Sequence, residues 1–235
     1  MTVASSRRAV VFDLDDTLHR ERRFILSGYS AVALEVERRW GVPRAASFRI
    51  MSGALRRGER ARAFQRLCWV LGLSEDVIPE LVGVLRAHVP SLRLPGSSVA
   101  VLSMLKPRWK LGILTNGLPA VQASKIQALG LSSLVDSVVM ADAVVPGGKP
   151  APEAFGEVLS RLDVGAERTW FVGNDLDSDV RGAKAAGLRA VWLRRRRSCA
   201  GGDEALGERE ADAVIEDLRE LPAVLSRVAR GKDRT

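Results

Sequence analysis

The sequence predicts an α/β protein in which a doubly wound parallel sheet carries helices on both faces and a helical domain is inserted after the first strand. Three observations support this fold class. Short, continuous apolar runs recur along the chain, helical patterns alternate with them, and the distance between the first two runs is too long for one helix. The length of 235 residues suits a core domain with an insert.

The apolar runs are typical of buried parallel strands, which are apolar on both faces. The first run covers residues 9–12 and stops abruptly at Asp13. Further strands are expected at 110–114, 135–140, 169–172, 190–193 and, as a short last strand, 213–215. Since ligands bind at the carboxyl ends of such strands, the residues that follow each run are the first candidates for a site.

Helical patterns occupy the segments between these strands. Residues 98–106 have apolar residues three apart and end before Pro107, and residues 119–129 end at Gly130, a typical C-cap. Helices are also expected at 152–162 and at 179–186, where Gly187 follows.

The insert is inferred from spacing. Thr115 and Lys149 are 34 positions apart, which fits one strand–helix–strand unit, whereas Asp13 and Thr115 are 102 positions apart. We expect a helical cap of about four helices over residues 19–94, with the clearest patterns at 25–40, 63–71 and 77–89. The core is then formed by residues 1–18 and 95–230, and the charged tail 231–235 is expected to be frayed.

The composition is typical of a globular protein that does not span a membrane. The chain is 46% hydrophobic and 27% charged, no segment approaches the length of a bilayer span, and the N-terminus lacks the features of a signal peptide. The two isolated cysteines fit a reducing cytosol, so a cytoplasmic protein is expected. The net charge of +8 permits nucleic-acid binding, but scattered charges and few aromatic residues favour a basic surface that meets anionic small molecules.

Three carboxylates, Asp13, Asp15 and Asp16, stand at the end of the first predicted strand. Their mutual repulsion is unfavourable unless a cation joins them. A helix N-terminus capped by acids is an alternative, but capping needs one acid rather than three. Asp13 and Asp15 point to the same side of an extended chain, and their oxygens suit Mg²⁺. We therefore predict a Mg²⁺ site here.

The segment 13–18, DLDDTL, resembles the first motif of the haloacid dehalogenase superfamily of hydrolases. Three later segments resemble the other motifs of that family in the same order: Thr115-Asn116-Gly117, Lys149-Pro150 and residues 173–179. The flanking residues Gln122, Lys125, Gly130-Leu131 and 180–184 match as well. The resemblance covers the chain except the cap, whose size and position look like the helical C1 type, and it implies a Rossmann-like core.

The resemblance implies a Mg²⁺-dependent hydrolase of phosphate monoesters that acts on a small phosphorylated metabolite through an aspartyl-phosphate. Asp13 would be the nucleophile, and Asp15 would protonate the leaving alcohol and then take a proton from water. Thr115 and the backbone N–H of Asn116 would hold the phosphoryl oxygens, and Lys149 would neutralise charge on Asp13 and the substrate. The implied metal ligands are Asp13, Asp15, Asn174, Asp175 and Asp179.

The fourth motif departs from the family pattern, which commonly has Asp where this chain has Asn174. An Asn can bind Mg²⁺ through its carbonyl oxygen but brings no charge, and Asp175 is the adjacent candidate to supply one. Asp15 favours phosphoryl transfer over carbon–halogen cleavage, which needs no acid for the leaving group. Phosphomutases share this acid, so a mutase remains an alternative.

Substrate choice is expected to reside in the cap. The cationic candidates are Arg20, Arg22, Arg23, Arg49, Arg56, Arg57 and Arg60, and Tyr29 is a candidate for hydrogen bonding to a substrate. For any one arginine, a solvated helix face is the preferred interpretation. The run from Arg194 to Arg197 favours a surface loop, with a site for an acidic partner or nucleic acid as the alternative. A phospho-acceptor signalling domain and a binding or regulatory protein on an inactive hydrolase scaffold remain alternatives, and the substrate and oligomeric state stay open.

Overall fold

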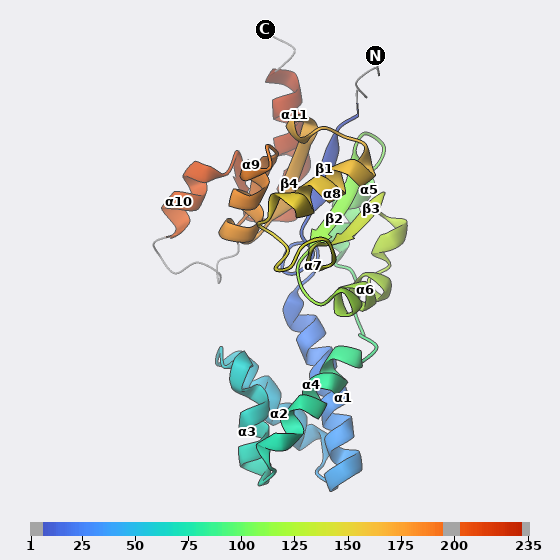
Figure 1. The fold of residues 1–235 in the computed structure, drawn as a ribbon, viewed down its shortest axis with the longest axis vertical. Coiled ribbons are helices and arrows are strands. Elements are labelled where there is room, and N and C mark those ends of the chain that lie inside the picture. Colours follow the sequence, from blue (N-terminus) through green and yellow to red (C-terminus); the bar gives the residue numbers. More distant parts are fainter. Residues whose placement is uncertain (1–6, 195–202, 232–235) are drawn as a thin grey trace. The chain divides into compact units, whose positions relative to one another are not determined.

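The computed structural model describes residues 7–194 and 203–231, which form two compact units. The first, called the α/β unit here, comprises the chain up to Arg20 and from Arg93 onward. The second, the helical unit, spans Glu21–Leu92. Figure 1 shows the strands and their flanking helices in the first unit and four helices in the second.

The α/β unit is built on a sheet in which all strand pairs are parallel, in the order β3-β2-β1-β4-β5-β6. The strands are β1 (Ala9–Phe12), β2 (Lys110–Thr115), β3 (Ser137–Met140), β4 (Thr169–Gly173), β5 (Arg189–Leu193) and β6 (Ala213–Ile215). The predicted α/β parallel sheet is confirmed. The strand order switches direction between β1 and β4, and ligands bind at such a switch point in doubly wound sheets.

The register of the sheet brings the candidate residues to one edge. Phe12 pairs with Ile113 of β2 and with Val172 of β4, so Asp13 follows β1 where Thr115 ends β2 and Gly173 ends β4. The backbone N–H of Asp13 donates to the carbonyl of Val172 over 2.9 Å. We call this the catalytic edge of the sheet.

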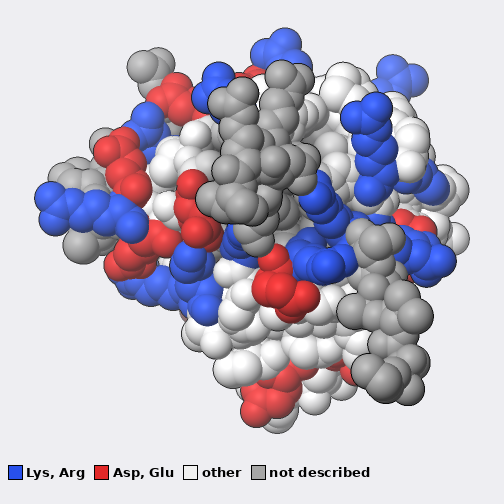
Figure 2. Space-filling view, turned by 90° about the horizontal axis from the view of Figure 1, so that it is seen from above, with Lys and Arg blue, Asp and Glu red and all other residues white. Residues whose placement is uncertain are grey.

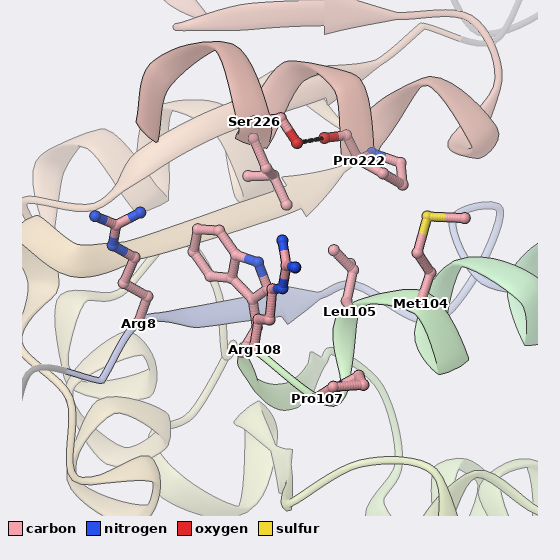
Figure 3. Close-up of a pocket in the computed structure, with 9 residues that line it drawn as sticks. Arg8, Met104, Leu105, Pro107, Arg108, Pro222 and Ser226 are labelled. Atoms are coloured by element: carbon pink, nitrogen blue, oxygen red, sulfur yellow. Dashed lines mark hydrogen bonds between the residues drawn. The ribbon is translucent and has the colours of Figure 1, made fainter. Parts of the chain in front are cut away.

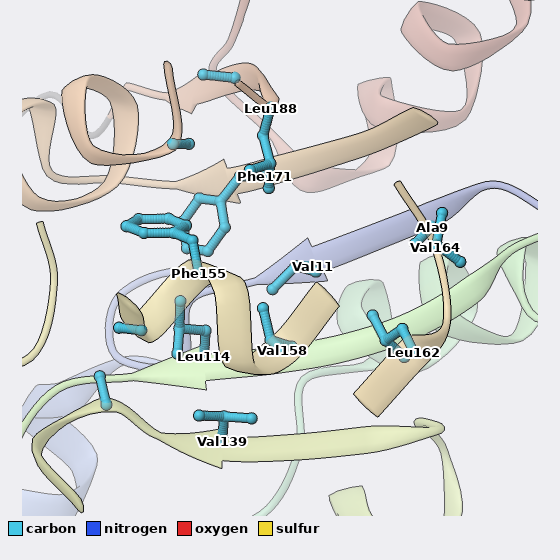
Figure 4. Close-up of a cluster of buried hydrophobic side chains, with 14 of the residues drawn as sticks. Ala9, Val11, Leu114, Val139, Phe155, Val158, Leu162, Val164, Phe171 and Leu188 are labelled. Atoms are coloured by element: carbon cyan, nitrogen blue, oxygen red, sulfur yellow. The ribbon is translucent and has the colours of Figure 1, made fainter. Parts of the chain in front are cut away.

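The helices of the α/β unit cover both faces of the sheet. They are α5 (Gly96–Leu105), α6 (Pro119–Ala128), α7 (Ala141–Val144), α8 (Pro152–Leu162), α9 (Gly182–Ala185), α10 (Asp203–Glu210) and α11 (Leu221–Gly231). Helix α8 packs against β2 and β3, and its Phe155, Val158 and Leu162 point to Val11 and Leu114 of the sheet (Figure 4). Helix α11 packs against α5. Burial of these apolar side chains holds the strand ends in fixed positions.

The helical unit contains α1 (Glu21–Trp40), α2 (Arg44–Arg56), α3 (Ala63–Leu71) and α4 (Ile78–Ala87). Helix α1 packs against α2 and α4, and its apolar residues recur at helical spacing on one side, as at Val32 and Val36. Tyr29 belongs to this core, with 2% of its surface exposed and its ring edge-on to Phe64. The structure therefore gives Tyr29 a packing role.

Several sequence predictions need adjustment. The helix expected at 179–186 begins earlier, because Asp175 caps a helical segment, Leu176–Arg181, that runs directly into α9. Helices α7, α10 and α11 were not predicted. Gly231 closes α11 rather than starting a tail, and residues 232–235 lie outside the described residues. So do three members of the arginine run, 195–197, and Cys199, whereas Cys68 is a buried free thiol.

Candidate active site

Four loops of the α/β unit supply the polar side chains at the catalytic edge. They follow β1, β2 and β4, and the fourth carries Lys149 between α7 and α8. Asp13, Thr115, Lys149 and Asp179 are all buried. Because burying charged groups is unfavourable unless they are paired, the partners of each one define the chemistry of the site.

Lys149 joins two carboxylates at the centre of the site. Its Nζ lies 2.8 Å from Oδ1 of Asp13 and 2.7 Å from Oδ1 of Asp179, and only 3% of the residue is exposed. Burial raises the pKa of Asp13 to about 7, with the negative charges of Asp179 and Asp15 adding to the effect and Lys149 opposing it. Burial lowers the pKa of Lys149, but the two carboxylates outweigh it and hold that pKa above its usual value.

Asp15 is held by a different set of residues. Its Oδ2 accepts hydrogen bonds from Lys125 Nζ at 2.6 Å and Gln122 Nε2 at 3.0 Å, and its Oδ1 lies 3.0 Å from Nε2 of His19. Burial alone raises the pKa of Asp15, but His19, Lys125 and Gln122 together hold it well below its usual range. Asp15 is therefore a carboxylate at neutral pH in this arrangement.

Gln122 also links Asp15 to the end of β2. Its Nε2 donates to Oγ1 of Thr115 at 2.9 Å and contacts the carbonyl oxygen of Asn116. The amide group of Gln122 thus bridges Thr115 and Asp15, so the two side chains belong to one polar cluster. Lys125 is three residues beyond Gln122 in α6, so both project from the same side of that helix.

Asn116 fixes the position of the Lys149 loop. Its Nδ2 donates to the carbonyl oxygen of Lys149, and its Oδ1 accepts from the N–H of Lys149, both over 2.8 Å. Gly148 has a φ of 60°, and a Cβ there would come within 2.6 Å of Asn116 Oδ1, so only glycine fits. The Asn116 side chain consequently has a structural role that the motif comparison did not indicate.

The loop after β4 is organised by Asp179. Its Oδ2 accepts from the backbone N–H groups of Asn174 at 3.0 Å and Asp175 at 3.1 Å, and a Cβ at Gly173 would overlap its carboxylate. Asn174 Oδ1 accepts from Oγ1 of Thr17 at 3.2 Å, which links this loop to the one after β1. Asp175 is exposed, and its Oδ1 accepts from the N–H and hydroxyl of Ser178 as a helix N-cap.

Several side-chain oxygens at this edge are candidate ligands for Mg²⁺. Among the described residues, no three acidic, histidine or cysteine side chains gather into a group that could cage a metal. Mg²⁺ usually takes one or two carboxylates, keeps several waters and receives further oxygens from a substrate phosphate. Asp13 and the amide oxygen of Asn174 fit that pattern, whereas the capping of Asp175 removes one of its oxygens. The full ligand set inferred from the motifs stays a prediction.

The arginines considered for substrate choice lie on the surface, Arg20 in the α/β unit and the other six in the helical unit. All seven arginines are exposed, and two of them form ion pairs, Arg57 with Glu59 at 3.1 Å and Arg60 with Glu21 at 2.8 Å. Arg194 is the described member of the arginine run, and its guanidinium pairs with Glu208 and Glu216. Such exposed pairs contribute little to stability, typically less than about 1 kcal/mol.

Residues 7–187 match the family model of the haloacid dehalogenase-like hydrolases. The chain belongs to this family. A glyceraldehyde 3-phosphate phosphatase from Methanothermobacter thermautotrophicus is 25% identical over 225 residues, which are 93% of this chain and 99% of that protein. The family resemblance inferred from the four motifs is confirmed.

Two solved structures of the family show the same fold. An HAD phosphatase from Thermococcus onnurineus has a TM-score of 0.60 and 27% identity, covering 93% of this chain and 97% of its own. A 2-haloacid dehalogenase from Pseudomonas syringae has a TM-score of 0.64 and 27% identity, covering 94% and 99%. A phosphatase and a dehalogenase therefore share this fold, so the reaction has to be inferred from the side chains at the catalytic edge.

Sequence reasoning missed three features of the site. His19 is buried against Asp15, but nothing in its sequence context distinguishes it. Gln122 and Lys125 were matched to the family only as flanking residues, although their spacing on one helix face could have indicated a shared target. The side-chain role of Asn116 could not be inferred, because its partner Lys149 lies 33 positions away.

Proposed function

We propose that this protein hydrolyses the phosphate monoester of a small metabolite, with Asp13 as the nucleophile and Mg²⁺ as the cofactor. The observation that carries the proposal is the buried Lys149, which touches both Asp13 and Asp179 while Asp15 has its own lysine, Lys125. The near full-length relative named as a phosphatase supports the same reaction class.

The charges at the catalytic edge suit a phosphate only when a divalent cation is present. The carboxylates of Asp13, Asp15 and Asp179 face the ammonium groups of Lys125 and Lys149, which leaves one net negative charge. A phosphate dianion entering such a site is repelled by several kcal/mol at an effective dielectric constant of about 20. When bound, Mg²⁺ supplies two positive charges and polarises a phosphoryl oxygen. Asp13 and Asn174 would hold it.

The first step breaks the ester bond. A carboxylate oxygen of Asp13 attacks phosphorus, a new P–O bond forms, and the electron pair of the old P–O bond leaves with the alcohol oxygen. Thr115 Oγ1 and the Asn116 N–H would hold phosphoryl oxygens during this transfer, and Lys149 would offset their charge. The second step returns Asp13 to its free form, because water attacks phosphorus and the aspartyl oxygen leaves.

Asp15 has to change protonation state between these steps. Its low pKa suits the second step, in which a carboxylate takes a proton from the attacking water. For the first step it needs a proton to give to the leaving alcohol. The charge of the incoming phosphate favours that proton, since a nearby negative charge raises the pKa of a carboxyl.

We further propose that the helical unit, Glu21–Leu92, is the cap that selects the substrate. The position of this unit in the chain, between β1 and α5, supports this role, as do the exposed arginines on that unit. A small phosphorylated metabolite is the substrate class that the relative's name supports. Systematic change of the exposed arginines to glutamine, with KM for a set of phosphorylated metabolites as the readout, tests this role.

Asp15 favours phosphate esters over the dehalogenase alternative. An acid–base group beside the nucleophile is needed when an alcohol leaves, and the contact of Lys125 with the Asp15 carboxylate supports that role. A signalling receiver domain is excluded by the match to the hydrolase family over residues 7–187. A phosphomutase uses the same first step and is separated by whether inorganic phosphate is released.

The test is hydrolysis of para-nitrophenyl phosphate with and without Mg²⁺, in the wild type and in Asp13→Asn. Mg²⁺-dependent release of inorganic phosphate that disappears in Asp13→Asn supports the proposal. Gln127→Leu is a suitable control, since Gln127 is exposed on α6. Absent turnover together with tight, salt-sensitive oligonucleotide binding would instead support a binding protein on an inactive scaffold.

A further inference from the structure

The α/β unit has a concave site at the edge of the sheet opposite the catalytic edge. This cavity has a volume of about 560 Å³. Its lining residues are Arg8, Met104, Leu105, Pro107, Arg108, Trp109, Pro222, Leu225 and Ser226. Arg8 directly precedes β1, whereas Asp13 directly follows it, and at about 3.3 Å per residue these positions are roughly 16 Å apart. The cavity is therefore separate from the candidate active site.

Two exposed arginines, Arg8 and Arg108, contribute positive charge to the cavity. None of the residues that line the cavity is acidic. The guanidinium carbon of Arg8 lies 5.9 Å from the ring centroid of Trp109. A guanidinium is a strong donor for an anionic oxygen, which it binds through paired hydrogen bonds.

The walls of the cavity are apolar, which a site for a bare anion would not require. Leu105 and Leu225 are buried, Pro107 and Pro222 add further apolar surface, and Met104 is 63% exposed. Figure 3 shows Arg8 and Arg108 on the strand side of the space and Pro222 and Ser226 on the helix above it. A volume of this size is typical of sites for small organic ligands.

The backbone that forms the cavity is fixed by hydrogen bonds. The N–H of Lys110 donates to the carbonyl of Arg8 at 2.9 Å, and the N–H groups of Arg108 and Trp109 both donate to the carbonyl of Leu105 at 3.0 Å. The hydroxyl of Ser226 donates to the carbonyl of Pro222 at 2.7 Å. Ligand binding in this cavity therefore orders little additional chain, so little conformational entropy is lost.

We propose that this cavity binds a small organic anion that carries one acidic group on an aromatic or apolar body. The acidic group would bind the guanidinium groups of Arg8 and Arg108, and the body would lie against Trp109 and Leu105. The chain carries a net charge of +8, which attracts anions over a longer range. Figure 2 shows exposed lysine and arginine side chains, together with aspartate and glutamate, on one face of the molecule. The bound ligand would lie far from the catalytic edge.

The test uses 8-anilinonaphthalene-1-sulfonate, an aromatic sulfonate whose fluorescence rises in apolar surroundings. Titration into the full-length protein is expected to show saturable binding at one site per chain. In the double variant Arg8→Gln/Arg108→Gln the affinity should fall at least tenfold. The neutral probe N-phenyl-1-naphthylamine should bind the wild type and the double variant equally, because it lacks the acidic group.

Arg189→Gln is the matched control. Arg189 also lies over a tryptophan, 5.3 Å from the ring of Trp170, and it begins β5 at the same edge of the sheet but does not line the cavity. Its affinity for the sulfonate should stay within twofold of the wild type. Equal losses in Arg189→Gln and in the double variant would overturn the proposal, as would an unchanged affinity in the double variant.

A second measurement locates the probe. The indole N–H signal of Trp109, assigned by its loss in Trp109→Phe, is expected to shift when the sulfonate is added. A shift confined to other tryptophans would place the probe elsewhere and overturn the proposal. Binding that weakens as the protein concentration rises would do the same, because a second copy of the chain would then occupy the cavity.

Discussion

Replacing Lys149 by Met removes the charge that the site depends on while keeping a side chain of similar length. The ammonium lies 2.8 Å from Asp13 and 2.7 Å from Asp179, so each contact contributes about 6 kcal/mol of attraction at an effective dielectric constant of about 20. The cost of burying the ammonium offsets most of this, and removing one partner from a buried pair typically costs about 3–5 kcal/mol. We expect Lys149→Met to lower the free energy of unfolding by that amount at pH 8.

The assay is urea unfolding without metal at pH 8 and pH 5. The loss should be smaller at pH 5, because the pKa of Asp13 is already about 7 and a proton can replace the missing cation. Lys110→Met is the control, since Lys110 forms a partly exposed pair with Asp136 and its loss should cost less than about 1 kcal/mol. Equal losses in the two variants at pH 8 would refute the reasoning.

Three further predictions follow from the same contacts. Asp13 keeps its proton to about pH 7 in the folded chain but releases it near pH 3.8 when unfolded, so the metal-free protein should lose stability as the pH rises between these values. Mg²⁺ should therefore raise the melting temperature more at pH 8 than at pH 5.5. An equal rise in melting temperature at both pH values contradicts this. Gln122→Leu should lower kcat at least tenfold by releasing Asp15 and Thr115, with little change in Gln127→Leu; steady-state kinetics of both variants checks it. Burial raises the pKa of Asp136, but the Leu111 N–H and Lys110 outweigh it and keep that pKa low. Asp136→Asn should therefore lower the free energy of unfolding by about 1 kcal/mol at pH 7 and by less below pH 4. Urea unfolding at both pH values measures this difference.

The strands could be predicted because their sequence carries an unambiguous signal. A parallel strand covered on both faces has to be apolar throughout, and the polar residue that ends each run, such as Asp13, marks the edge where ligands bind. Helix α11 carries a comparable signal, since Leu221 and Leu225 are four positions apart and both buried. The early start at Leu176 was hidden, because Asp175 resembled a metal ligand as much as a helix cap.

The partners of the site residues were harder to infer than the residues themselves. The family resemblance implied that Lys149 neutralises the charge of Asp13, whereas the second pairing, Lys125 with Asp15, was not predicted. This division depends on where the α6 helix and the Lys149 loop meet the strand ends. Those contacts are set by packing between segments about 110 and 136 positions apart, which no local pattern records.

The central claim is that Asp13 accepts the phosphoryl group. A rapid acid quench with radiolabelled para-nitrophenyl phosphate, followed by peptide mapping, measures this directly. The account predicts label on the peptide that contains Asp13, more of it in Asp15→Asn, where the second step lacks its base, and none in Asp13→Asn. Phosphate release at the full rate with no labelled peptide in either the wild type or Asp15→Asn would contradict it.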